Sequence, residues 1–242
     1  LELASYPYIV DVRGSGLSIP WAIKGVRLLR DGLPIMEADG WYHSQLIEPL
    51  DLQHVDVYRG ASALAYGAST LGGAINFVTQ TGYTADPFVA RVETSGDDYN
   101  HVQLASGKVL GQGWDYYASL SGYYSDGWRD QSATHSTMFY GNLGYRESAS
   151  AETRLHLSID DSSQQLAGSL TRSQLEADPT QANPASLFYG DANAFKRYRL
   201  DAQHTVLLDG GGRLDAGAFY ETQTIFHPLE WDVYDMDKQN YG

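Results

Sequence analysis

The sequence predicts a mainly β protein in two parts, a small α+β unit followed by long antiparallel strands. Composition supports this, because the 242 residues include 25 Gly and 18 Tyr, and Tyr, Gly, Ser and Thr interleave as they do in strands joined by tight turns. The pattern also changes near residue 83. Short apolar runs broken by Gly and Pro precede that point, and long alternating stretches follow it. We therefore expect residues 1–82 and 83–242 to form two domains.

The first unit is expected to be rich in loops. Apolar runs predict short strands over residues 8–12, 26–29 and 54–58, and Gly72 and Gly73 mark a bend or a close backbone approach before the run at 74–78. Pro49 and Asp51 suit the start of one helical turn within residues 47–52. Asp31 and Gly32 predict a hairpin turn after the second of these strands, because Gly accepts the positive φ that such turns require.

The second unit alternates apolar and polar residues with a period of two, which is the pattern of a strand with two unlike faces. The clearest runs cover residues 114–125, 154–160 and 197–208. They are about 10 to 13 residues long, whereas strands of soluble sheets usually have about five or six and a tilted membrane strand needs about 9 to 11. Alternation alone is equally compatible with a soluble β-sandwich.

The connections between these runs favour a membrane barrel. Turns at 111–113, 148–150 and 209–212 are short, whereas those at 126–135 and 162–193 are long, so short and long connections alternate. Outer-membrane barrels sort their loops in this way because successive strands return to the same side. The pattern therefore favours antiparallel transmembrane strands of a β-barrel, of which we count about seven.

Several functional classes are disfavoured. The net charge is -14 and no Lys/Arg cluster is present, which argues against nucleic-acid binding. There is no Cys, no H-E-x-x-H motif and no apolar run of the roughly 18 residues that a spanning helix needs. The neighbouring acids Asp97–Asp98 and Asp160–Asp161 point to opposite faces of a strand, so we expect solvated strand ends rather than the acid pair of a glycosidase. We predict no enzyme activity, metal site or cofactor.

A family resemblance rests on three ordered motifs. Residues 55–79 read VDVYRGASALAYGASTLGGAINFVT, with VRG at 12–14 and GVRLLRDGLP at 25–34 upstream. Together they resemble the plug domain of TonB-dependent outer-membrane receptors, and residues 55–79 resemble its closing segment. Ala61 is a minor departure, because many members have Pro after Arg-Gly.

The resemblance implies a plug remainder at 1–82, truncated at its N-terminus, and the first barrel strands at 83–242, truncated at the C-terminus. Barrels of that family have about 22 strands, so the resemblance implies that the roughly seven counted here belong to an incomplete barrel. The implied function is import of a scarce nutrient, most often a ferric siderophore, across the outer membrane of a Gram-negative bacterium through plug rearrangement. The implied partners are a TonB-type energy-coupling protein, outer-membrane lipid and the ligand, and iron enters only as part of that ligand.

The resemblance also suggests roles for individual residues. Arg13 and Arg59 occupy Arg-Gly positions whose arginines latch the plug to glutamates of the barrel, a task that suits the planar guanidinium. Either could instead be an ordinary arginine that covers a strand. The remaining motif positions are structural glycines that serve turns and close packing: Gly14, Gly60, Gly67, Gly72 and Gly73.

Ligand contact is expected on outward-facing loops. The candidates are Trp21 and Lys24 in loop 15–24, Trp41, Tyr42 and His43 in loop 36–44, and Arg172, Phe188 and Tyr189 in the long loop. Aromatic faces with polar tips suit a siderophore or corrinoid surface. The alternative for the trio at 41–43 is packing against the barrel interior. At the level of the whole chain, composition alone also permits a soluble acidic β-sandwich that binds carbohydrate.

Overall fold

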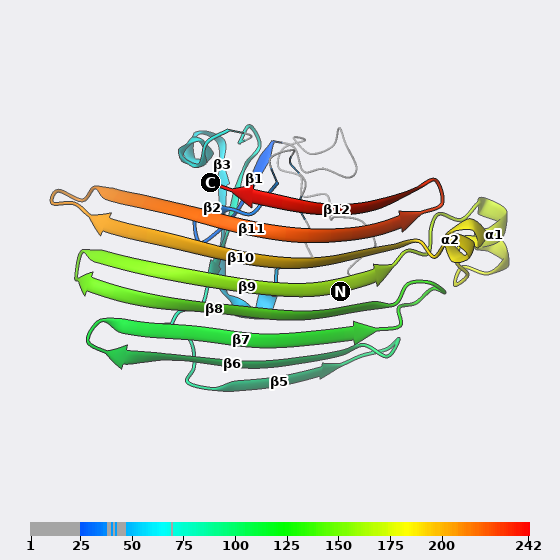
Figure 1. Cartoon of the computed structure of the whole chain (residues 1–242), viewed down its shortest axis with the longest axis horizontal. Coiled ribbons are helices and arrows are strands. Elements are labelled where there is room, and N and C mark those ends of the chain that lie inside the picture. The colour runs from blue at the N-terminus through cyan, green and yellow to red at the C-terminus, as the bar shows by residue number, and fades with distance from the viewer. Residues whose placement is uncertain (1–24, 38–39, 41, 43–46, 69) are drawn as a thin grey trace.

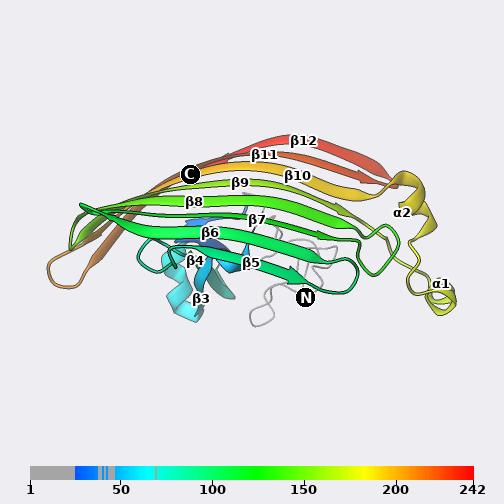
Figure 2. The same cartoon turned by 90° about the horizontal axis from the view of Figure 1, so that it is seen from below.

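The computed structural model describes residues 25–37, 40, 42, 47–68 and 70–242. Within them the chain forms a four-stranded sheet and an eight-stranded sheet. The larger sheet is a curved layer, and the smaller one lies beneath its concave face (Figures 1 and 2). The fold class predicted from the sequence is confirmed.

The smaller sheet, called the plug sheet below, has the strand order β2-β1-β4-β3. Its strands are β1 (Val26–Arg30), β2 (Leu33–Pro34), β3 (Leu52–Arg59) and β4 (Gly73–Thr79). β1 runs parallel to β4 and antiparallel to β2. The predicted hairpin turn joins β1 to β2, with φ of 51° at Asp31 and 86° at Gly32.

Two short 3₁₀ helices flank β3. η2 (Pro49–Asp51) is the predicted helical turn, and its N-cap Glu48 accepts a hydrogen bond from the backbone of Leu50. η3 (Gly60–Tyr66) leads toward β4. The core of this unit lies mainly on one side of β1, where buried apolar side chains gather: Val26, Leu28, Ile35, Met36 and Tyr42.

The larger sheet, called the wall below, is a meander in which each strand pairs antiparallel with the next, in the order β12 to β5. It has eight strands rather than the seven or so expected. They are β5 (Val89–Thr94), β6 (Asn100–Gly111), β7 (Trp114–Ser125), β8 (Thr134–Ser148), β9 (Ala151–Gln165), β10 (Ala192–Leu207), β11 (Arg213–Leu229) and β12 (Asp232–Tyr241).

The wall connections differ in length at its two ends. Short turns follow β6, β8 and β10, whereas the connection from β9 to β10 holds two helices, α1 (Arg172–Ala177) and α2 (Pro184–Tyr189). These helices project beyond one end of the wall (Figure 1). The turn from β11 to β12 is short although it lies at the long-loop end, so the predicted alternation is not strict. No helix in the described ranges is long and apolar enough to cross a membrane.

The two faces of the wall have opposite polarity. Its concave face buries polar residues, and Ser158 and Arg199 are each 1% exposed there. Its convex face exposes apolar residues such as Leu120, Leu157 and Leu200. Sheets of a soluble sandwich turn their apolar faces toward each other, whereas barrel strands turn theirs outward around a polar interior. The wall has the barrel arrangement, not that of the carbohydrate-binding sandwich.

Asp160 corrects one expectation. It is not a solvated strand end, because its side chain is buried on the concave face and forms an ion pair of 2.8 Å with Arg197. Asp97 and Asp98 do lie in an exposed turn, with φ of 55° and 50°.

Candidate functional site

The plug sheet meets the concave face of the wall through polar side chains. Along each wall strand these polar side chains occupy every second position, so they all lie on the same face of the sheet. The buried polar residues of that face include His101, Gln103, Asp115, Ser119, Asn142, Arg154, His156, Ser158, Asp160, Arg197, Arg199, Asp201 and Glu221. This interface is the candidate functional site, because any movement of the plug unit must break it.

Arg30, the last residue of β1, is a buried charged residue through which the plug sheet contacts the wall. Its Nη2 donates a hydrogen bond of 2.6 Å to Ser158 Oγ and lies 3.7 Å from Asp201 Oδ2. The guanidinium also lies over the ring of Tyr140, 5.1 Å from its centroid. A buried arginine needs such partners, because an unpaired charge away from water is very costly.

Two wall arginines complete the charge balance around Arg30. Arg199 forms ion pairs with Asp201 at 2.8 Å and Glu221 at 3.3 Å, and its Nη2 donates a hydrogen bond of 2.9 Å to the carbonyl of Pro34 in the plug sheet. Arg197 pairs with Asp160. Arginines and carboxylates therefore alternate across this part of the interface.

Asp31 forms the centre of a second contact. Its carboxylate accepts hydrogen bonds from the backbone and hydroxyl of Thr79, at 2.9 and 2.8 Å, and its carbonyl accepts one from Gln203. Thr79 Oγ1 and the Tyr140 hydroxyl share a hydrogen bond of 2.7 Å, and that hydroxyl lies 2.8 Å from His156 Nδ1. The β1–β2 turn is thus tied both to β4 and to the wall.

A third contact lies at η2. Gln103 Nε2 and the Tyr117 hydroxyl donate hydrogen bonds of 3.0 and 2.9 Å to Asp51 Oδ1, and Glu48 Oε2 lies 3.1 Å from His101 Nε2. Burial raises the pKa of Asp51 to about 6, although hydrogen bonds from Ser119 and Tyr117 act in the opposite direction.

A fourth contact holds the segment that leaves the plug sheet. The backbone N–H of Gly82 donates a hydrogen bond of 2.9 Å to Asp115, which is fully buried and paired with Arg154 at 2.8 Å. Asn142 Nδ2 donates to the carbonyl of Gln80 at 2.8 Å. The plug sheet therefore joins the wall at a fixed point.

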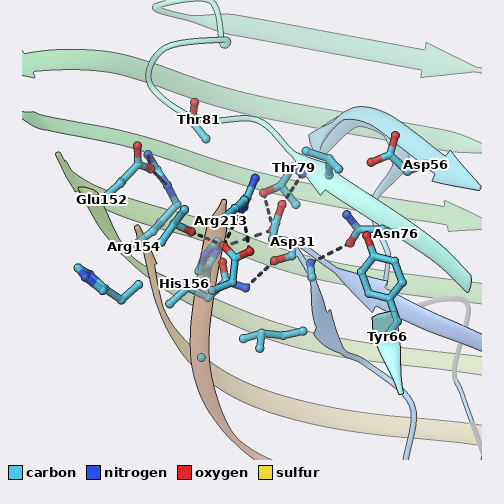
Figure 3. Close-up of a pocket in the computed structure, with 18 of the residues that line it drawn as sticks. Asp31, Asp56, Tyr66, Asn76, Thr79, Thr81, Glu152, Arg154, His156 and Arg213 are labelled. Carbon is cyan, nitrogen blue, oxygen red and sulfur yellow. Dashed lines mark hydrogen bonds and ion pairs between the residues drawn. The ribbon is translucent and has the colours of Figure 1, made fainter. Parts of the chain in front are cut away.

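Between these contacts the two sheets separate around a cavity of about 820 Å³. Figure 3 shows Asp31, Thr79, Arg154 and His156 facing into this region. β3 lines the cavity, and among the described residues its side chains form no hydrogen bond or ion pair with the wall. The plug sheet is thus anchored along β1, η2 and the segment after β4, and is separated from the wall at β3.

Arg59, one of the two predicted latch residues, ends β3 with an exposed side chain. Within the described part of the chain, that side chain forms no hydrogen bond or ion pair. Arg13 lies outside the described residues, as does Gly14. The latch role of both arginines stays a prediction, whereas Arg30 is the plug arginine that contacts the wall here.

The other predicted glycines lie at bends and close contacts. Gly60 and Gly67 have φ of 65° and 89°, values that residues with a Cβ rarely adopt. The backbone N–H groups of Gly72 and Gly73 both donate to the carbonyl of Gly25, at 2.8 and 3.3 Å. These arrangements agree with a structural role.

The predicted ligand residues lie in different environments in the structure. Trp21, Lys24, Trp41 and His43 lie outside the described residues. Tyr42 is buried in the plug core, an environment that differs both from an outward-facing ligand loop and from the alternative of packing against the barrel interior. Arg172 and Tyr189 are exposed on α1 and α2, and Arg172 forms an exposed pair with Glu176 at 2.8 Å. The structure does not bring Tyr42 together with the loop residues.

Sequence reasoning missed the roles of Arg30, Asp31 and Asp201. The alternation pattern did put Arg197, Arg199 and Asp201 on a polar face, but it gave no reason to bury that face against the plug. A usable signal was the number of charged residues in the middle of long strands, because solvent-facing strands rarely need paired charges there. Among the described residues no group of three or more His, Asp or Glu forms a metal site.

The comparisons with known proteins agree with this geometry. Residues 6–74 match the family model of the TonB-dependent receptor plug domain. The Rhizobactin receptor of Rhizobium meliloti (strain 1021) is 26% identical over 210 residues, which cover 76% of this chain and 28% of that protein.

Solved structures share the fold. The ferric citrate transporter FecA, in its unliganded form, aligns with a TM-score of 0.70 at 22% identity, covering 86% of this chain and 32% of that one. The siderophore receptor PirA from Acinetobacter baumannii aligns with a TM-score of 0.63 at 16% identity, covering 96% and 37%.

The chain thus spans roughly a third of the length of the proteins it matches. The matched plug and the shared arrangement of plug and wall confirm the resemblance found in the motifs. Residues 6–74 therefore match the plug domain of TonB-dependent receptors, and the chain shares its fold with the ferric citrate transporter FecA and the siderophore receptor PirA.

Proposed function

We propose that the protein is an outer-membrane receptor that binds a ferric siderophore and imports it when a TonB-type protein of the inner membrane acts on the plug. The relatives support the ligand class, because they include a rhizobactin receptor, a ferric citrate transporter and a siderophore receptor. The apolar convex face of the wall suits outer-membrane lipid. In this proposal residues 1–82 belong to the plug and 83–242 to the barrel.

The observation that carries the proposal is the chemistry of the plug–wall interface. Its contacts are hydrogen bonds and ion pairs, notably Arg30 with Ser158 and Asp201, rather than an apolar core. Water can replace polar partners when they separate, whereas separated apolar surfaces lose their full burial energy. Such an interface holds the plug in place and still permits it to rearrange during transport.

The test is uptake of iron by cells. The full-length receptor is expressed in a Gram-negative strain that lacks its own siderophore receptors. Uptake of ⁵⁵Fe is then measured with iron complexes of rhizobactin, citrate, enterobactin and pyoverdine, with and without TonB. We expect saturable uptake of at least one complex that disappears without TonB. Absence of both uptake and binding for all four complexes would contradict the proposal.

A further inference from the structure

Two neighbouring loops of the wall are joined by a single arginine. Arg129 lies in the connection between β7 and β8, and it donates to three carbonyls of the connection between β9 and β10. Its Nε and Nη2 donate to Gln181 at 3.1 and 2.9 Å, and its Nη1 donates to Gly168 at 2.9 Å. Nη2 also donates to Ala167 at 3.3 Å. The guanidinium thus links both ends of the segment that contains α1.

Further hydrogen bonds join the same two loops, which we call the loop junction. The backbone N–H of Asp130 donates to the Thr180 carbonyl at 2.8 Å, and Gln131 Nε2 donates to that of Asp191 at 3.3 Å. Ser132 Oγ accepts from the backbone N–H of Arg129 at 3.1 Å, which fixes the arginine's own loop. Gly127 has a φ of 75° in the same loop.

The junction continues into the two helices. Gln181 Nε2 donates to the Gln174 carbonyl in α1 at 2.7 Å, and the backbone N–H of Asn183, the N-cap of α2, donates to Ala167 at 2.7 Å. Both helices are therefore attached to the backbone that Arg129 holds. A long loop fixed at its base in this way has fewer conformations to lose when it binds a ligand.

The helices present an exposed aromatic pair. Phe188 is 82% exposed and Tyr189 55% exposed at the end of α2, and their rings meet edge to face with centroids 5.0 Å apart. Large apolar side chains that stay exposed on a structured loop are typical of binding surfaces.

We propose that Arg129 is a positioning residue for ligand capture: it fixes the loop that carries α1 and α2, so that Phe188 and Tyr189 form a preformed surface for the incoming iron complex. This inference rests on the proposed function and assigns a role to a residue that does not itself touch the ligand. Lysine can replace it only in part, because the three donors of an ammonium share one nitrogen, whereas the guanidinium makes four hydrogen bonds from three nitrogens held in one plane.

The test uses the full-length receptor and two readouts. In the first, a spin label is attached to a cysteine introduced at the exposed Ala177 of α1. We expect a restricted label in the otherwise unchanged receptor, a mobile one in Arg129→Ala and an intermediate one in Arg129→Lys. Gly127→Ala should also free the label, because Gly127 has a positive φ and the added Cβ would lie 2.7 Å from the backbone carbonyl oxygen of Ser132, which would displace the loop.

The second readout is the concentration dependence of uptake for the four iron complexes named above. We expect Arg129→Ala to raise the apparent KM at least about fivefold and to leave the maximal rate within about twofold. Arg129→Lys should restore part of the loss. The control is Arg146→Ala, which removes an arginine near the other end of β8 that pairs with Glu152 at 2.9 Å.

The outcomes separate the two proposals. If the unchanged receptor neither takes up nor binds any of the four complexes, the proposed function fails, and the role of Arg129 in capture fails with it, even where the label shows a loop junction. If the receptor transports iron but Arg129→Ala and Gly127→Ala change neither the label nor the KM, the positioning role alone is overturned.

Discussion

At the scale of single residues, the plug is held by buried charges whose partners come from strands far away in sequence. Arg30 reaches Ser158 and Asp201, and Arg199 reaches back to the carbonyl of Pro34. Removing one member of such a group leaves the others without their full set of partners, which costs more than the lost contact itself.

Arg30→Ala should therefore loosen the plug, whereas Arg59→Ala should not. We expect Arg30→Ala to destabilise the plug–wall interface by about 2 kcal/mol, which raises the equilibrium constant for opening roughly thirtyfold. The reason is that it removes one member of a buried group of paired polar side chains. Arg59 is exposed, so its removal should change the interface by less than about 0.5 kcal/mol. Hydrogen exchange of the β1 and β4 amides in the full-length receptor measures both. Equal protection in the two variants would contradict this assignment.

Asp51 should make the same interface depend on pH. Its pKa is raised to about 6 in the docked plug, so the docked state binds the proton more tightly than the unfolded chain does. The contribution is thus fully present below the ordinary pKa of about 3.9 and is lost as the pH rises through about 6.

Asp51→Asn should remove this dependence. We expect thermal unfolding of the full-length receptor in detergent to lose stability between pH 4 and pH 7, by up to about 3 kcal/mol, and the variant to lose less over that range. The amide oxygen can still accept from Tyr117 and Gln103, which keeps the variant a fair comparison. Parallel pH profiles for the two proteins would show that Asp51 is not the group responsible.

At the scale of elements, the sequence predicted those features that depend on residues close together in the chain. The Asp31–Gly32 turn, the short helix at η2 and the 114–125 strand all follow from turn residues or alternation and were found where expected. The helices α1 and α2 were not predicted, because each has only six residues and is held by caps and by Arg129 rather than by an apolar stripe. The polar site was missed for a similar reason, since its residues acquire partners only when the plug docks.

The segment that joins plug and wall gives an element-scale prediction. A Cβ on Gly82 would lie 2.5 Å from the carbonyl oxygen of Lys108 and 2.8 Å from Asp115 Cβ, whereas a Cβ on Gly96 would meet nothing within 4 Å. Because the oxygen belongs to the wall backbone, it cannot move aside easily. Gly82→Ala should lower the free energy of unfolding by about 2 kcal/mol, and Gly96→Ala by less than about 0.5 kcal/mol. Urea unfolding of the full-length receptor compares them, and equal midpoints would refute the close approach.

At the scale of the whole molecule, the wall is a sheet whose polar face is inside and whose apolar face is outside. Alternation in the sequence predicted that each strand has two unlike faces. It did not show which face is buried, because the strands of a soluble sandwich alternate in the same way. The structure determines the orientation of the sheet, because buried residues such as Arg199 and Asp201 contact the plug sheet. Under the proposed function, the convex face is the one that contacts lipid.

Leu200 tests that orientation. It lies at the middle of β10 on the convex face, beside Leu157 of β9 and Tyr220 of β11, and is 53% exposed. An arginine at the bilayer midplane of a barrel costs about 2 to 4 kcal/mol, but near the interface only about 0 to 1. Leu200→Arg should therefore sharply reduce insertion of the full-length receptor into the outer membrane. Leu214→Arg, an exposed position on the same face near the start of β11, should have little effect. In a water-soluble sheet both would be neutral surface changes, so equal amounts of the two variants in membrane fractions would remove the lipid-facing assignment.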